Sequence, residues 1–202
     1  MIEMKRYNDI HDVFIQHGGI VKTSEILRQG FHNRYLVKLM EQGKVVRLKP
    51  GYYQWIEEND IEEAAIIAKL FPDAVVCLDS ALYYHSYTDR TPVSWHLAVD
   101  KDSSKSRFNI KFPPIQPYFT EGKYLGIGVE TVFIQGIELK VSDRERTICD
   151  VLRYVNKMER EIVNKAIQAY IKDPKQNITR LMEYAKKLRV LQKVKNWVGV
   201  WL

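Results

Sequence analysis

The chain of 202 residues has little of what most metal and redox sites require. It has two cysteines, Cys77 and Cys149, far apart and each among apolar neighbours, which predicts buried free thiols and no disulfide bridge. The five histidines show no metal-ligand spacing with each other or with the cysteines. A glycine-rich phosphate loop, a GxSxG motif and an HExxH motif are also missing. We therefore expect no metal and no other cofactor.

Long apolar runs are absent as well. No stretch approaches the ~18 apolar residues that a transmembrane helix needs, and the first residues, MIEMKRYNDI, have no apolar segment of signal-peptide length. The hydrophobic fraction of 46% is nevertheless ample for a packed core. These observations predict a folded protein of the reducing cytoplasm, without membrane contact.

Positive charge is concentrated at the two ends of the chain. Residues 1–56 carry nine Lys/Arg against five Asp/Glu, residues 57–170 carry 14 against 18, and residues 171–202 carry eight against two. The corresponding net charges are +4, −4 and +6, which sum to the +6 of the whole chain. Basic ends favour contact with nucleic acid, although a basic tail that docks on an acidic protein would show the same distribution.

Residues 20–55 have the order of elements of a winged helix-turn-helix, with a short apolar run, two short helical patterns separated by Gly30, and a hairpin around Lys49-Pro50-Gly51. A helix over residues 5–17, ended by Gly18-Gly19, would support it. Thr23 is a candidate N-cap for the first helix of the pair. The fold class expected for the whole chain is α+β.

The second helical pattern has two distinct faces. Leu36, Leu39 and Met40 share one stripe, which places Arg34 and Lys38 on the opposite side, with Asn33 near the N-terminal end. A recognition helix carries its groove-facing residues there, and Arg47 and Lys49 near the hairpin tip could reach phosphates. A solvated basic face or a protein-docking module would give the same pattern.

The remainder of the chain predicts a mixed α/β domain that ends in a helical bundle, with domain limits at 1–58 and 59–202. Three capping signals predict helix starts, namely Asp60 with Glu63, Asp79, and Ser142 with Glu145. Residues 95–99 read as a strand and residues 128–142 as a hairpin around Gln135-Gly136. Residues 100–117 have loop composition and predict an exposed excursion. Amphipathic helices follow to the C-terminus, where Trp197, Trp201 and Leu202 are expected in the core.

A catalytic site is weakly indicated. The nearest candidate is a nuclease-type set of Asp100 and Glu130 near strand ends, with Lys101 or Lys140, which could hold Mg²⁺. Because 28% of the residues are charged, such sets arise by chance, and we expect no enzyme.

Three motifs together resemble the AbiEi family of antitoxins, which belong to type IV toxin-antitoxin systems of abortive phage infection. They are GGIVKTSEILRQG, the segment GKVVRLKPGYYQW and the helix SDRERTICDVLRYV, and the resemblance spans nearly the whole chain. It implies a transcriptional repressor of its own promoter that also antagonises a nucleotidyltransferase-type toxin. A structural role is implied for Arg146, Thr147 and Asp150. The DNA contacts implied by the resemblance are Thr23, Ser24, Asn33, Arg34, Tyr35, Lys38, Arg47 and Lys49.

Two departures from the family pattern and one alternative function bear on this expectation. His32 stands where a small hydroxyl usually caps the recognition helix, and that helix is often richer in arginine, which predicts weaker phosphate affinity here. The alternative is a stand-alone winged-helix regulator whose C-terminal domain serves dimerisation or sensing. A DNA-processing nuclease is the third possibility.

Overall fold

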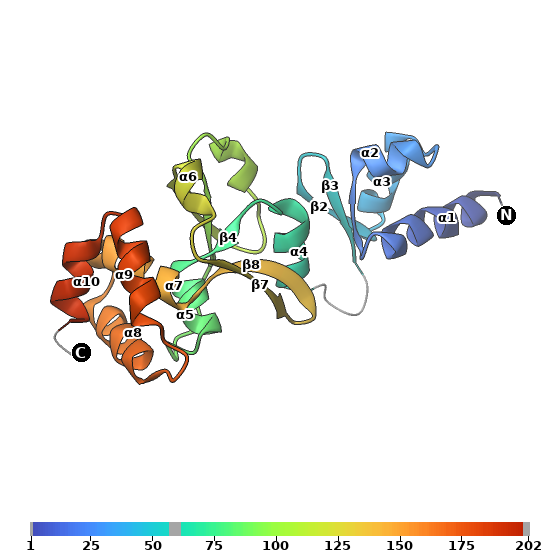
Figure 1. Ribbon diagram of the computed structural model, residues 1–202. Coiled ribbons are helices and arrows are strands. Elements are labelled where there is room, and N and C mark those ends of the chain that lie inside the picture. Colours follow the sequence, from blue (N-terminus) through green and yellow to red (C-terminus); the bar gives the residue numbers. More distant parts are fainter. Residues whose placement is uncertain (1, 57–61, 200–202) are drawn as a thin grey trace. The chain divides into compact units, whose positions relative to one another are not determined.

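The computed structural model describes residues 2–56 and 62–199, which form two compact units (Figure 1). The first unit comprises residues 1–72 with 105–113, and the second comprises residues 73–104 with 114–202. Both contain helices and strands, so the predicted α+β class is confirmed. The predicted boundary between residues 58 and 59 falls in the segment 57–61, outside the described residues, and stays a prediction.

The first unit follows the predicted order of elements and adds a helix and a short helical turn. A three-stranded antiparallel sheet has the order β1-β3-β2, so that the third strand lies in the middle. Gly18 and Gly51 adopt φ values of 68° and 82°, which glycine reaches without steric cost, and they turn the chain after α1 and at the hairpin tip. The elements are α1 (Ile2–Gln16), β1 (Ile20–Lys22), α2 (Thr23–Arg28), α3 (Asn33–Glu41), β2 (Val45–Lys49), β3 (Tyr52–Trp55), α4 (Glu63–Leu70) and η1 (Lys105–Phe108).

An apolar cluster between the helices and the sheet stabilises the first 55 residues. Phe14 and Leu36 are fully buried, and Trp55 places its ring centroid 5.3 Å from that of Phe14 and 5.4 Å from that of Tyr7. Fully burying one such side chain contributes about 1.5–3 kcal/mol. This cluster holds α3 by its apolar stripe and β3 by its aromatic residues.

Two predicted helix caps are wrong by one or two positions. Helix α2 begins at Thr23, whose N–H donates to the Gly51 carbonyl at 2.9 Å, and Lys22 is its N-cap. Cys77, and not Asp79, precedes α5 (Leu78–Tyr84), because its own N–H is bound to the His96 carbonyl of the neighbouring strand. The predicted cap Asp60 lies outside the described residues, and the helix there begins at Glu63.

The second unit is built on a mixed five-stranded sheet of order β6-β5-β4-β8-β7. The outer pairs are β5 with β6, which are parallel, and β7 with β8, which are antiparallel. The predicted turn at Gln135-Gly136 forms, with φ values of 53° and 77° that suit a two-residue hairpin loop. The strands are β4 (Val75–Val76), β5 (Trp95–Asp100), β6 (Ile115–Thr120), β7 (Val129–Ile134) and β8 (Ile137–Ser142).

The predicted exposed excursion over residues 100–117 is only partly correct. Pro117 lies inside β6, where it faces Leu97 of β5, and an edge strand tolerates a residue without an N–H. Phe108 is buried at 8% exposure, and its ring stacks on Phe71 at a centroid distance of 5.4 Å. Phe108, in a segment whose composition indicated a loop, thus removes apolar surface from water by packing on Phe71.

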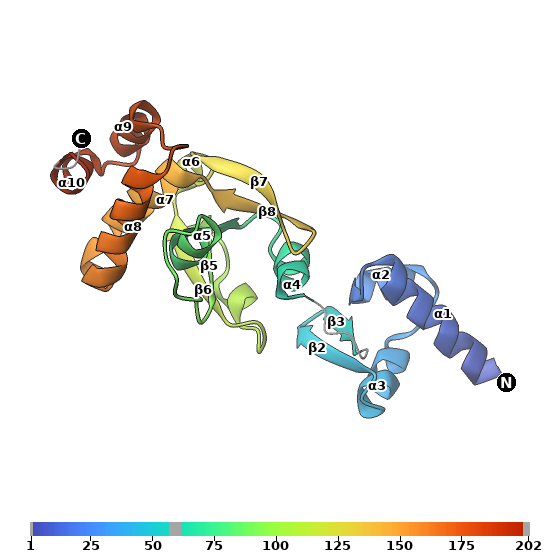
Figure 2. The ribbon, with the colours of Figure 1, turned by 90° about the horizontal axis from the view of Figure 1, so that it is seen from below.

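Helices at the C-terminal end pack on helix α7 (Arg144–Arg153), and they lie together in both views (Figure 1, Figure 2). The apolar faces predicted for them supply fully buried residues such as Val163, Tyr170 and Leu181. Trp197 packs against this core, whereas Trp201 and Leu202 lie outside the described residues. The other elements are α6 (Gly122–Leu125), η2 (Val155–Lys157), α8 (Arg160–Lys172), α9 (Ile178–Lys187) and α10 (Leu191–Trp197).

The predicted helix cap at the start of α7 is also wrong. Asp143 is the N-cap and accepts the N–H of Arg146 at 2.8 Å, one residue later than the predicted Ser142. Ser142 is still the last residue of β8, and its carbonyl accepts the Nε2 proton of His85 at 2.7 Å. Glu145 therefore does not close a capping box, and it accepts the N–H of Asn177 at 2.8 Å.

Gly128 provides a test of the packing around the first turn of α7, where it lies against Arg146 and Tyr184. A Cβ atom at this position would lie 2.6 Å from both Arg146 Cβ and Tyr184 Cε2, and the φ of +62° is unfavourable for alanine. Gly128→Ala should lower the free energy of unfolding by about 2–5 kcal/mol, from backbone strain and overpacking together. Gly136→Ala has a similar φ of +77° but open space, so it should lose only about 1–2 kcal/mol. Urea denaturation of both variants would measure the difference, and equal losses would contradict the packing described.

Candidate nucleic-acid interface

Helix α3 presents a polar face to solvent because its apolar stripe is buried. Leu36 and Leu39 are 0% and 4% exposed, and they lie roughly opposite Arg34 and Lys38 at 100° per residue. The exposed side chains of the outward face belong to Asn33, Arg34, Val37, Lys38 and Glu41. Arg34, Lys38 and Asn33 were predicted there. The face thus offers two cations and one amide side chain that can donate hydrogen bonds to phosphate or to base edges.

The hairpin of β2 and β3 exposes Arg47 through an irregularity in strand pairing. The register shifts between Arg47 and Lys49, so Val46 and Arg47 are both exposed while Leu48 is buried. A regular strand would have alternated these side chains between the two faces. Arg47 is therefore exposed to solvent near the hairpin tip, where the sequence predicted it.

Lys49 has a different environment from Arg47. Its Nζ donates to the Leu70 carbonyl at 3.3 Å and lies 4.6 Å from the ring centroid of Tyr52 and 4.5 Å from that of Phe71. Its side chain is half-buried. A phosphate contact by Lys49 would have to replace these interactions, so it is a weaker candidate than Arg47.

Lys22 is a basic residue that the sequence did not single out. Its Nζ lies 5.5 Å from the Tyr52 ring centroid, and residue 22 faces residue 52 across the pair β1 and β3. The sequence could have indicated Lys22 only if the register between β1 and β3, which places it opposite Tyr52, had been known. Lys22 and Lys49 therefore bracket the same ring.

The N-terminus of α2 is occupied by a carboxylate of the chain itself. Glu25 Oε2 accepts the Lys22 N–H at 2.7 Å, and Glu25 Oε1 lies 3.5 Å from Lys69 Nζ. Burial alone would raise the pKa of Glu25, but the Lys22 hydrogen bond and the Lys69 charge lower it below its ordinary value. Because an anion already sits at this helix end, an incoming phosphate near Thr23 and Ser24 would meet a negative charge.

Thr23, Ser24 and Tyr35 complete the predicted contact set. Ser24 is exposed, and Thr23 and Tyr35 are half-buried. The Tyr35 ring packs edge-on against Phe31 at 6.1 Å, and the Arg34 guanidinium lies 5.4 Å from the Tyr35 ring centroid. Tyr35 thus lies beside the guanidinium end of the Arg34 side chain.

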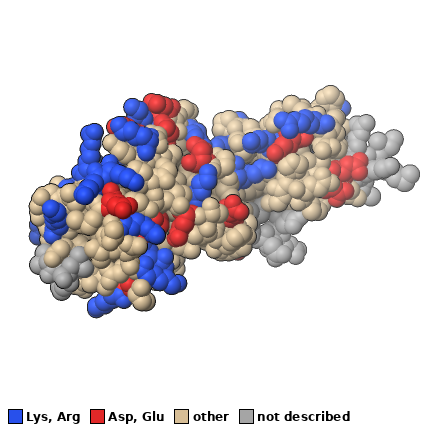
Figure 3. All heavy atoms as spheres, in the orientation of Figure 1, with Lys and Arg blue, Asp and Glu red and all other residues tan. Residues whose placement is uncertain are grey.

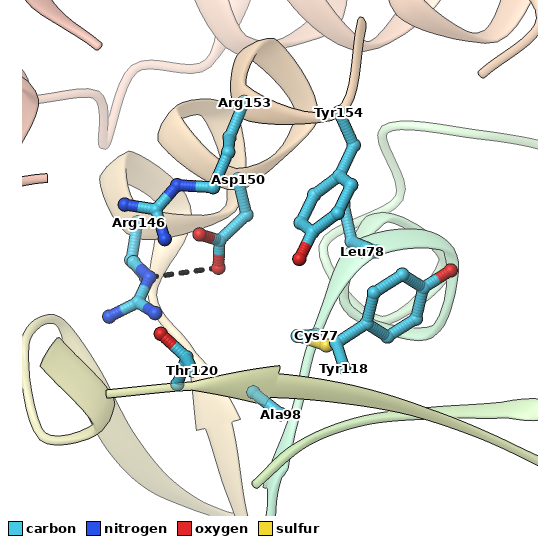
Figure 4. Close-up of a pocket in the computed structure, with 9 residues that line it drawn as sticks. All are labelled: Cys77, Leu78, Ala98, Tyr118, Thr120, Arg146, Asp150, Arg153 and Tyr154. Carbon is cyan, nitrogen blue, oxygen red and sulfur yellow. Dashed lines mark hydrogen bonds and ion pairs between the residues drawn. The ribbon is translucent and has the colours of Figure 1, made fainter. Parts of the chain in front are cut away.

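The family-like motif in the second unit forms a buried ion pair. Arg146 and Asp150 are 2% and 5% exposed, and Arg146 Nε donates to Asp150 Oδ2 at 2.8 Å. Arg146 Nη1 also donates to the carbonyls of Tyr124 and Ile127, both at 2.6 Å. Figure 4 shows both side chains pointing from α7 toward the strands that carry Ala98 and Thr120. Burial raises the pKa of Asp150, and the charge of Arg146 opposes that rise.

These contacts agree with the structural role implied for Arg146, Thr147 and Asp150. Thr147 Oγ1 donates to the Ser142 carbonyl at 3.2 Å, which ties the start of α7 to the end of β8. The Arg146 guanidinium holds the turn between α6 and β7 through two carbonyls. The motif therefore joins a helix, a strand end and a loop.

The residues suggested for a nuclease centre are not brought together. Glu130 lies on β7 and Asp100 at the end of β5, with β8 and β4 between those strands. Three strand spacings of about 4.8 Å place the backbones of these two strands about 14 Å apart, so the two residues do not share one site at neighbouring strand ends. Within residues 2–56 and 62–199, no group of three or more His, Cys, Asp or Glu side chains is placed to hold a metal ion.

The buried ion pair gives a stability prediction. Asp150→Asn would leave the Arg146 charge buried without its counterion, so the free energy of unfolding should fall by about 3–5 kcal/mol. The matched control is Glu159→Gln, which breaks an exposed pair with Arg90 and should leave stability unchanged. Urea denaturation measures both variants. Equal unfolding midpoints would show that the Arg146–Asp150 pair is dispensable.

Two further features are the distribution of charged side chains on the surface and the length of the apolar helices. Lys and Arg side chains are numerous over the C-terminal helices, and the first unit shows both signs of charge (Figure 3). Among the described helices, none combines the length and the apolar composition needed to cross a bilayer.

Comparison with known proteins gives a family match for the N-terminal part of the chain. No protein of curated function matches the chain. Among solved structures, the RV2827C protein from Mycobacterium tuberculosis is similar with 9% sequence identity and a TM-score of 0.47, over 89% of this chain and 75% of that chain. Residues 8–54 match the sequence model of the family described as "Transcriptional regulator, AbiEi antitoxin". The resemblance to AbiEi antitoxins is thereby confirmed for this segment, which contains the α3 face and the hairpin.

Proposed function

We propose that the protein is an antitoxin of a type IV toxin-antitoxin system that also represses its own promoter. Residues 1–58 bind double-stranded DNA as a winged helix, and residues 59–202 antagonise a nucleotidyltransferase-type toxin. The protein acts in the cytoplasm, without a cofactor and without catalytic turnover. The match of residues 8–54 to a family of transcriptional regulators and antitoxins supports the assignment of DNA binding to residues 1–58.

One observation carries the DNA-binding part. The burial of Leu36 and Leu39 turns Asn33, Arg34 and Lys38 outward on the second helix of a helix-turn-helix. In this arrangement α3 enters the major groove and Arg47 of the adjoining hairpin contacts the backbone. Arg34 suits guanine and Asn33 suits adenine, while Lys38 suits a phosphate.

A stand-alone regulator that senses an effector is the second candidate function. It uses the same DNA interface and differs in what the second unit does. A cavity of about 620 Å³ in the second unit favours it. The two candidates are distinguished by whether the chain relieves toxicity of a co-expressed toxin.

The DNA-binding proposal predicts a salt-dependent interaction that depends on the α3 face. Each phosphate contact releases counterions, so removing two cations should weaken promoter binding most strongly at low salt and flatten its salt dependence. The double variant Arg34→Ala with Lys38→Ala should bind its promoter at least about tenfold more weakly, with a log–log salt slope reduced by about 2. Fluorescence anisotropy at several salt concentrations measures both quantities.

The matched control removes an exposed lysine outside the α3 face. Lys172→Ala, in α8 of the second unit, should keep both the affinity and the salt slope of the unaltered protein. If the double variant and this control bind alike, the α3 face is not the DNA interface.

The two-part proposal also predicts that repression and antitoxicity separate. In cells that carry the toxin gene on an inducible plasmid, the Arg34→Ala, Lys38→Ala variant should restore growth as the unaltered protein does. The same variant should fail to repress a reporter driven by the operon's promoter. Loss of growth rescue in a variant that accumulates normally would contradict the assignment of antitoxicity to residues 59–202.

A further inference from the structure

The second unit contains a cavity of about 620 Å³ that has no part in the proposed DNA interface. Its walls come from the start of α5, from the adjacent strands β5 and β6, and from the segment 154–162. The volume lies in the range of about 300–1,000 Å³ that is typical of small-molecule sites. Tyr118 and Tyr154, drawn in Figure 4 as lining the neighbouring small pocket, also line this cavity.

Asp79 contributes a partly exposed carboxylate to this wall, with a side chain that is 34% exposed. Its Oδ1 is buried and has no hydrogen-bond partner among the described residues, and its Oδ2 lies 3.9 Å from His96 Nε2. Burial lowers the pKa of His96, and the charge of Asp79 opposes that shift. At neutral pH the imidazole is therefore uncharged, and it does not neutralise the carboxylate.

The other charges at the cavity do not neutralise Asp79 either. Glu159 is negative and is paired with Arg90, whose Nη1 lies 2.9 Å from Glu159 Oε2. Lys157, an exposed residue of the lining, carries the only positive charge among the lining residues. Because Arg90 balances Glu159, the remaining charges at the cavity are Asp79 and the exposed Lys157, and the preference for a cation rests on the Asp79 carboxylate itself.

Two tyrosine rings line the same cavity as the carboxylate. The Tyr118 ring lies edge-on to Tyr154 at 5.2 Å, and the Tyr118 hydroxyl is 3.2 Å from His96 Nδ1. Met158 and Ile162 add apolar surface to the same cavity. A cavity lined by a carboxylate and by tyrosine rings suits an ammonium group, which gains a charge-assisted hydrogen bond and cation–π attraction, while the apolar surface suits a flat ring.

We propose that this cavity binds a small aromatic amine, with the ammonium group on Asp79 and the ring against Tyr118 and Tyr154. The site would give the second unit a ligand of its own, beyond antitoxicity and DNA binding. A compound of this size in an open pocket should bind with a Kd on the order of 0.1–1 mM.

The direct test is isothermal titration calorimetry of the full chain with tryptamine. Tryptophol, which has the same indole and a hydroxyl in place of the amine, is the matched neutral probe. Tryptamine should saturate one site, and tryptophol should bind at least about tenfold more weakly because it cannot form the ion pair. Equal affinity for both, or no saturation by tryptamine up to about 10 mM, would overturn the proposal.

Variants locate the binding site. Asp79→Asn should weaken tryptamine binding by about 10- to 100-fold, because it replaces a charge-assisted hydrogen bond with a neutral one. Lys157→Glu should strengthen it by about two- to fivefold, and a destabilised protein would not produce such a gain. The control Lys172→Glu has the same charge change outside the cavity lining and should bind as the unaltered chain does. If Asp79→Asn does not fold, an affinity for Lys157→Glu equal to that of Lys172→Glu would overturn the proposal.

Discussion

The burial of Leu36 and Leu39 is the constraint on which the DNA-binding account depends. These two side chains fix the rotation of α3 about its own axis, and every other residue of the helix takes its exposure from that choice. Phe14 of α1 and Trp55 of β3 belong to the same apolar cluster, so the helix and the sheet stabilise one orientation. Arg34 and Lys38 point outward for that reason.

In the second unit, one buried arginine connects elements that are distant in sequence. Arg146 donates to the carbonyls of Tyr124 in α6 and Ile127 in the turn before β7, and to Asp150 one turn later on α7. Glu145, its neighbour, accepts a hydrogen bond from Asn177 and another from the Tyr170 hydroxyl at 3.3 Å. Buried charges are costly unless they are paired, so this polar centre persists only because its partners are in place. The motif that the sequence associates with a family is therefore explained here by packing.

Much of the first unit and of its candidate interface could be predicted from the sequence. The 3.6-residue period of Leu36, Leu39 and Met40 predicted the outward face of α3, and the Pro50-Gly51 turn predicted the hairpin. The caps at Thr23, Asp79 and Ser142 were wrong because tertiary contacts decide which backbone N–H groups remain free. The anchoring of Lys49 by Leu70 and the burial of Phe108 on Phe71 depend on residues far apart in sequence. No local pattern carries such information, and the same holds for the cavity around Asp79.

The most direct measurement of the α3 assignment is site-directed DNA cleavage from Val37, which is 44% exposed and lies on the same helix face as Arg34 and Lys38. In Val37→Cys both cations are retained, and an iron chelate should attach selectively because Cys77 and Cys149 are buried. With promoter DNA, the account predicts strand cuts confined to a few nucleotides on either side of one major-groove segment. Cleavage that is diffuse, or no stronger than that from Lys172→Cys, would contradict it.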